Sequence, residues 1–132
     1  MKNGGAISWK SKKQPIVSLS SMEAEYIALC TAGKEAIWLR QLETDLKSST
    51  AKSIVLNEDN QAAIKLAKNS IMFDRSKHID VRYHWIREQV AAGTVTLQYC
   101  PTDMMVADIF TKPLQRLLHS KFLKLLGLVD RA

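Results

Sequence analysis

The sequence has few cysteines and no long apolar run, and each shortage argues against a class of protein. Cys30 and Cys100 lie far apart, and neither belongs to a close-spaced ligand pair, so we expect buried thiols rather than zinc ligands or a disulfide framework. The sequence contains no run of about 18 apolar residues, so it predicts no transmembrane helix. The N-terminus also lacks the apolar core and cleavage site of a signal peptide. We therefore expect a soluble intracellular protein, cytoplasmic or nuclear, with no membrane partner.

Composition and length favour one packed domain. Hydrophobic residues make up 46% of the 132 residues and charged residues 24%, which are ordinary values for globular proteins. The chain is too short for two independent cores, so one unit over residues 1–132 is expected. The net charge of +6 favours a polyanionic partner such as nucleic acid, although many basic enzymes share it.

Strand and helix patterns alternate along the chain. Residues Ala6–Lys12 alternate as a half-exposed strand does, and Ser20 with Glu23 forms a capping box that opens a helix to about Leu46. Its core-facing stripe is expected at Leu29, Ala32, Ala36 and Leu39. Strands are predicted at 53–57 and 94–99, and helices at 61–68, from Ile79 to Gly93, around 107–110 and after Pro113. This order predicts an α/β fold with a partly parallel sheet, whose ligands gather where strands end.

Three acids lie where such a fold could bring them together. Glu25 heads the stripe of the long helix, Asp59 follows the strand at 53–57, and Asp108 lies in a helical run after the strand at 94–99. Each also has a structural explanation, because Glu25 suits the helix dipole, Asp59 could cap the next helix, and Asp108 could face solvent. Converging carboxylates could instead hold Mg²⁺, and two such ions about 4 Å apart can hydrolyse a phosphodiester.

Four motifs in order resemble the ribonuclease H domains of copia-type retrotransposon Pol polyproteins. They are Ile7–Gln14 followed by Leu19–Tyr26, Glu58–Ile64, Ser76–His84 and Ala107–Leu114. The resemblance implies a mixed sheet flanked by helices, and a hydrolase that cuts the RNA strand of RNA–DNA hybrids with two Mg²⁺ ions. It assigns the family's second, third and fourth catalytic acids, which are also metal ligands, to Glu25, Asp59 and Asp108.

The same resemblance implies an N-terminally truncated domain. The family's first acid, which both metals share, and its first two strands would lie upstream of Met1. Residues 1–14 would then be a residual strand, 20–114 the catalytic-site segments and 115–132 a C-terminal helix. Because the shared acid would be missing, we expect the chain alone to be inactive. Because one edge of the strand at 53–57 would lie open, we also expect a marginal fold, a re-paired sheet, or dependence on an upstream Pol segment. The oligomeric state is left open.

Other residues carry more general predictions. Glu58 stands where the family commonly has cysteine, and we expect it to face solvent, the alternative being that it adds negative charge to the metal site. His78 and His84 are interpreted as packing or hydrogen-bonding residues, and Trp9 and Trp85 as core residues. Basic side chains could follow a nucleic-acid backbone or simply be solvated: Lys10, Lys12, Lys13, Arg75, Lys77 and Lys112. A second hypothesis is a catalytically dead nucleic-acid-binding or structural remnant.

Overall fold

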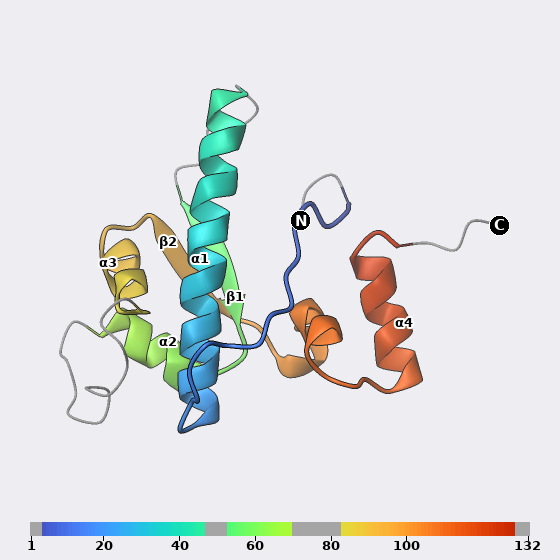
Figure 1. Ribbon diagram of the computed structural model, residues 1–132. Coiled ribbons are helices and arrows are strands. Elements are labelled where there is room, and N and C mark those ends of the chain that lie inside the picture. The colour runs from blue at the N-terminus through green and yellow to red at the C-terminus, as the bar shows by residue number, and fades with distance from the viewer. Residues whose placement is uncertain (1–3, 47–52, 70–82, 129–132) are drawn as a thin grey trace. The chain divides into compact units, whose positions relative to one another are not determined.

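The computed structural model describes residues 4–46, 53–69 and 83–128 (Figure 1). They fall into two compact units, one formed by Ser18–Cys100 and the other by Met1–Val17 with Pro101–Ala132. Arg75, Lys77, His78 and Ile79, which carry sequence predictions, lie outside the described residues. Each unit is treated by itself below.

The unit of residues 18–100 is an α/β layer. Its elements follow the order α1 (Ser21–Asp45), β1 (Ile54–Glu58), α2 (Gln61–Lys68), α3 (Trp85–Ala91) and β2 (Val95–Tyr99). The two strands pair in parallel, from Ile54 opposite Val95 to Glu58 opposite Tyr99. Figure 1 shows the long α1 running beside this sheet. The α/β class is therefore confirmed, and it is compatible with a ribonuclease H-like fold.

The start of α1 follows the predicted capping box. The Ser20 hydroxyl accepts a hydrogen bond from the backbone N–H of Glu23 at 3.1 Å, and the Glu23 carboxylate accepts one from the N–H of Leu19 at 2.8 Å. Both interactions satisfy donors at a helix start that the helix itself leaves unpaired. Glu23 is buried by this role, which separates it from Glu25 two residues on.

The core face of α1 differs in part from the predicted stripe. Leu29 is buried as expected, but Ala32 is exposed and Ala36 and Leu39 are half-buried. The buried residues of α1 lie instead in its first four turns: Tyr26, Ile27, Leu29, Cys30 and Gly33. Helix α1 is longer than the small sheet and the helices that pack against it. Fewer residues are therefore available to cover its later turns.

Gly33 lies where α1 packs tightly against α3 and β1. A Cβ at this position would lie 2.7 Å from Cδ1 of Ile86 and 3.6 Å from Cδ1 of Leu56 in β1. Leu56 therefore faces α1, and Val95 and Leu97 of β2 are buried as well. Because side chains alternate along a strand, Val55 projects to the other face and is 56% exposed. The sheet has one packed face and one open face.

Helix α2 begins and ends where local signals predict, and helix α3 ends close to its predicted stop. The Asn60 side chain caps α2 by accepting hydrogen bonds from the N–H groups of Ala62 and Ala63. After α3 the chain turns at Gly93, whose φ of 71° is a conformation that glycine adopts at little cost. Within the described residues α3 begins at Trp85.

The second unit combines the N-terminal segment with the C-terminal helices. The strand predicted at Ala6–Lys12, and with it the residual strand of 1–14, is not formed, because described residues 6–14 have no strand conformation. A strand needs a partner for its backbone hydrogen bonds, and this segment is held instead by single contacts. The N–H of Ala6 donates to the carbonyl of Leu126, and the Ser11 hydroxyl donates to the carbonyl of Phe110.

The helices of this unit are short except the last. The helix expected around residues 107–110 is a 3₁₀ helix, η4 (Val106–Phe110), and it is preceded by another, η3 (Thr102–Met104). The amphipathic helix α4 (Arg116–Leu125) buries Phe122, with Leu126 just beyond it. Among the residues described in either unit, no helix is long and apolar enough to cross a membrane.

Candidate metal site and nucleic-acid-binding residues

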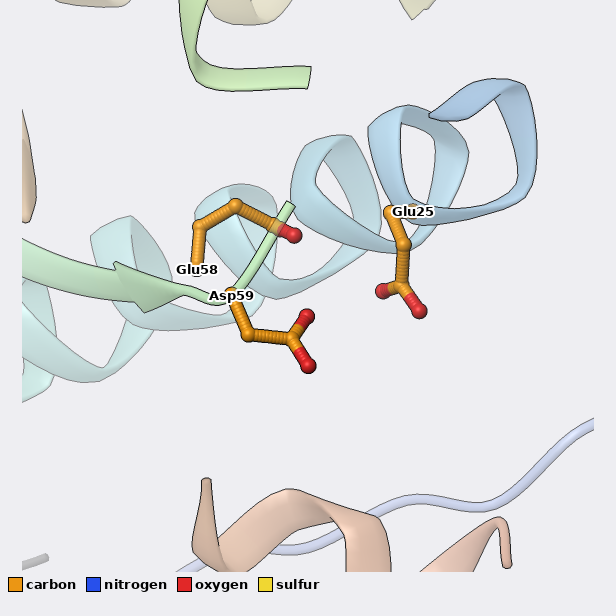
Figure 2. A group of neighbouring side chains, drawn as sticks. All are labelled: Glu25, Glu58 and Asp59. Carbon is orange, nitrogen blue, oxygen red and sulfur yellow. The ribbon is translucent and has the colours of Figure 1, made fainter. Parts of the chain in front are cut away.

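Three carboxylates converge between α1 and the end of β1. Glu25, Glu58 and Asp59 each offer an oxygen, and these oxygens all lie within 4.8 Å of one another. Figure 2 shows the three side chains directed into the same space, Glu25 from the helix and the other two from the strand end. The structure thus brings together two of the acids predicted from sequence, Glu25 and Asp59, and adds Glu58.

The secondary structure explains how each acid reaches this point. Glu25 lies in the second turn of α1, next to the buried Tyr26 that fixes this part of the helix. Glu58 ends β1 on the same face as Leu56, since residues two apart in a strand share a face. Asp59 follows the last residue of β1. The alternation of side chains along the strand therefore does not force it to the face opposite Glu58. The cap of α2 is Asn60, so Asp59 is not needed as a cap.

Glu58 does not face solvent, which corrects the expectation from sequence. It is only 5% exposed, and its Oε1 accepts a hydrogen bond from the N–H of Asn60 at 3.0 Å. Burial above all, with a smaller contribution from the negative charges of Glu25 and Asp59, raises the pKa of its carboxyl to about 7, although backbone hydrogen bonds act to lower it. The alternative reading, extra negative charge in the acidic group, is the one the geometry supports.

The donor set suits a hard divalent cation. All three ligands are carboxylates, which Mg²⁺ prefers, and opposite ligands of one Mg²⁺ ion are about 4 Å apart. The carboxylate oxygens lie within 4.8 Å of one another, which is close to that separation. A cation would also relieve the repulsion among three neighbouring carboxylates. These residues therefore fit the ion that the sequence resemblance implies.

Asp108 lies in the other unit and has a different environment. It is 7% exposed within η4, so it does not face solvent. The Lys112 ammonium lies 2.9 Å from both of its carboxylate oxygens. Whether Asp108 joins the acids near β1 stays a prediction.

The predicted nucleic-acid-binding residues divide into two groups. Lys10, Lys12 and Lys13 are exposed on the N-terminal segment. Trp9 beside them is 67% exposed, so its predicted burial in the core is wrong. Lys112 is exposed over 43% of its side chain while it pairs with Asp108.

His84 and Trp85 have structural contacts, as expected for His84. The Tyr26 hydroxyl and Nδ1 of His84 lie 3.1 Å apart, which connects α1 to the residue before α3. Tyr26 is fully buried, and burial raises its pKa. Trp85 is half-buried, and the ammonium of Lys34 lies 5.5 Å from its ring centroid.

Two functional contacts were missed although the sequence carries a signal for each. Glu58 lies two residues after Leu56 and four after Ile54, so extending the predicted strand by one residue places all three on the same face. Asp108 and Lys112 are four residues apart, a spacing at which opposite charges meet on helical turns. Both signals are local and need no knowledge of the tertiary fold.

Comparison with known proteins gives consistent relatives. The chain is 48% identical over 114 residues to the retrovirus-related Pol polyprotein from transposon TNT 1-94 of Nicotiana tabacum, covering 86% of this chain. It is 37% and 38% identical to those from transposons RE2 and RE1 of Arabidopsis thaliana, covering 93% and 92% of it. In each case it spans 8% of the relative's length. No protein-family profile matches the chain, and no solved structure matches it.

Proposed function

We propose that this chain, which belongs to the Pol polyproteins of copia-type retrotransposons, carries metal-binding residues of a ribonuclease H domain that hydrolyses the RNA strand of RNA–DNA hybrids. The observation that carries the proposal is the convergence of Glu25 and Asp59 at the end of β1. Motif resemblance assigns both as catalytic acids, and the fold brings them together from positions 34 residues apart in the numbering.

The proposed roles follow from the chemistry of the side chains. Glu25 and Asp59 would hold Mg²⁺ through carboxylate oxygens, and Asp108 is the third ligand that the resemblance assigns. When bound, a pair of Mg²⁺ ions activates water and stabilises the leaving oxygen of a phosphodiester. Glu58 lies beside these two carboxylates and is shielded from water. Because burial raises its pKa to about 7, it adds its full negative charge to theirs only above neutral pH.

The basic N-terminal segment supports a nucleic-acid partner. Lys10, Lys12 and Lys13 are exposed beside the exposed ring of Trp9. Lysines that neutralise phosphates dominate the affinity of such interfaces, and an exposed tryptophan can stack on an unpaired base. The expected partner is an RNA–DNA hybrid.

The test measures metal binding and cleavage separately. Mn²⁺ binding to the 132-residue chain should weaken by about tenfold or more in Glu25→Gln and Asp59→Asn, since each removes a charged ligand. Glu35→Gln, an exposed residue of the same helix, is the matched control and should bind as the wild type does. Absence of Mn²⁺ binding to the wild type, or equal binding by all four proteins, would overturn the proposed metal site.

Cleavage should be measured with Mg²⁺ on a labelled RNA–DNA hybrid. The chain is assayed alone and joined to the residues that precede the matched segment in the Nicotiana tabacum relative, because the resemblance assigns the first acid to that region. We expect RNA-strand cleavage only in the joined form, and its loss in Glu25→Gln. Cleavage that survives in Asp59→Asn would contradict the assigned role.

A second candidate function is hybrid binding without cleavage. The specific observation in its favour is the exposed Trp9 within the basic segment, which suits binding whether or not the acids are active. Salt-sensitive hybrid binding with no cleavage at any Mg²⁺ concentration, in the joined form as well, would favour it.

A further inference from the structure

Glu58 reaches the same space as the two acids that the motifs assign to the metal. It ends β1, is only 5% exposed, and offers an oxygen within 4.8 Å of an oxygen of Glu25 and of Asp59. Figure 2 shows its side chain at the strand end, close to both neighbours. A cation among these oxygens would therefore meet Glu58 as well as Glu25 and Asp59.

Backbone hydrogen bonds hold the Glu58 carboxylate in place without using all of its acceptor capacity. Its Oε1 accepts the N–H of Asn60 at 3.0 Å, and Asn60 caps α2, so the carboxylate is tied to the start of that helix. The backbone of Asp59 hydrogen-bonds to it as well. Because a carboxylate has about four lone-pair sites, it can still bind a cation. A ligand that is already fixed in position loses little conformational freedom when it binds.

The charges around Glu58 favour a bound cation. Among the described residues, the charged groups that influence its carboxyl are Glu25 and Asp59, and both are negative. A buried charge is costly unless an opposite charge lies nearby, and like charges add to that cost. A divalent ion among the three carboxylates would supply the opposite charge. Glu58 would therefore be stabilised in two ways, by direct attraction to the ion and by relief of the repulsion.

We propose that Glu25, Glu58 and Asp59 together bind one divalent cation, with Glu58 as its third protein ligand. The inference rests on the proposed function, because it takes Glu25 and Asp59 as ligands. All three residues belong to the unit of residues 18–100, so the site needs neither Asp108 nor the acid that the resemblance assigns upstream. Glu58 stands where the family commonly has cysteine, so this ligand departs from the family pattern.

Binding of this ion and cleavage of RNA are then separable. Hydrolysis by the proposed mechanism uses a pair of ions, whereas the three acids hold one. The 132-residue chain should therefore bind a divalent ion although we expect it to be inactive alone. Metal binding does not depend on the upstream segment, and cleavage does.

Isothermal titration calorimetry with Mn²⁺ at pH 8 tests the third ligand in the chain alone. The wild type should bind one ion per chain. Glu58→Gln should bind Mn²⁺ about threefold to tenfold more weakly, a smaller loss than in Glu25→Gln, because backbone hydrogen bonds already share the charge of Glu58. Glu35→Gln, the exposed control on α1, should bind as the wild type does. A urea midpoint of metal-free Glu58→Gln at or above that of the wild type shows that the fold is kept.

Carbon-13 NMR of the side-chain carboxyls tests direct contact in the wild type and depends on no variant. At pH 9, above the Glu58 pKa of about 7, the carboxyl is ionised, so a shift on addition of Mg²⁺ does not come from loss of a proton. We expect the resonances of Glu25, Glu58 and Asp59 to shift with one midpoint while that of Glu35 stays unchanged.

Three results would overturn the inference and leave the proposed function standing. They are a shift confined to the Glu25 and Asp59 resonances, Mn²⁺ affinity of Glu58→Gln equal to that of the wild type, or two ions bound per chain. No metal binding by the wild type would overturn both the inference and the proposed metal site.

Discussion

Replacing Glu58 with glutamine should stabilise the unit of residues 18–100 at neutral and alkaline pH. The pKa of Glu58 is about 7 in the folded protein against an ordinary value of 4.5. Between these values the folded state holds one more proton than the unfolded chain, so stability falls as pH rises through this window. Each pH unit removes about 1.4 kcal/mol, and the loss across the window is at most about 3 kcal/mol.

Glutamine keeps the shape and the acceptor of the side chain but carries no charge. Its carbonyl can accept the N–H of Asn60, as Oε1 of Glu58 does at 3.0 Å, and its amide can donate to the neighbouring carboxylates. Relative to the wild type, Glu58→Gln should therefore gain up to about 3 kcal/mol in unfolding free energy at pH 8 and nothing at pH 4.

Urea denaturation followed by tryptophan fluorescence measures this gain. The chain has three tryptophans, and only Trp9 lies outside residues 18–100, so a Trp9→Phe background limits the signal to this unit. Glu35→Gln is the matched control, because it makes the same change on the exposed surface of α1 and should shift stability by less than about 0.5 kcal/mol. A gain that is equal at pH 4 and pH 8, or a loss at pH 8, would refute the burial argument.

Three further substitutions test the packing around the acids in the same assay. Gly33→Ala should lower the unfolding free energy by about 1–3 kcal/mol, although alanine favours helices, because the new Cβ would lie 2.7 Å from Ile86; a gain would show that α1 and α3 separate readily. Tyr26→Phe should cost about 1–2 kcal/mol through the lost partner of His84, and an unchanged midpoint would show that this contact is dispensable. Ser20→Ala should cost about 1 kcal/mol by uncapping α1; no change would argue that the other cap contacts suffice.

The local elements of the fold could be predicted from the sequence because their signals are local. The Ser20 cap, the apolar run that becomes β1 and the stop at Gly93 each act within a few residues. The strand expected at Ala6–Lys12 failed for the opposite reason. Its alternation was suitable, but a strand is completed by a neighbour, and no pattern within the segment supplies one.

The candidate site was predictable to the same extent. Glu25 and Asp59 were identified by motif and by their places at a helix start and a strand end, and the fold brings their oxygens within 4.8 Å, together with one of Glu58. Glu58 was wrongly predicted to face solvent. That prediction considered only its departure from the family pattern and not its position two residues after Leu56 at the end of the strand. Asp108 lies in the other unit, and whether it meets the first two depends on tertiary structure that no spacing determines.

The acids differ in the charge that surrounds them, and this difference orders their roles. Glu25, Glu58 and Asp59 are neighbouring carboxylates whose mutual repulsion a cation would relieve. Asp108 already has a cation in contact with both oxygens. A divalent cation would therefore relieve repulsion at the first group, whereas the charge of Asp108 is already balanced by Lys112. It follows that Glu25 and Asp59, rather than Asp108, should supply most of the protein's affinity for a divalent cation.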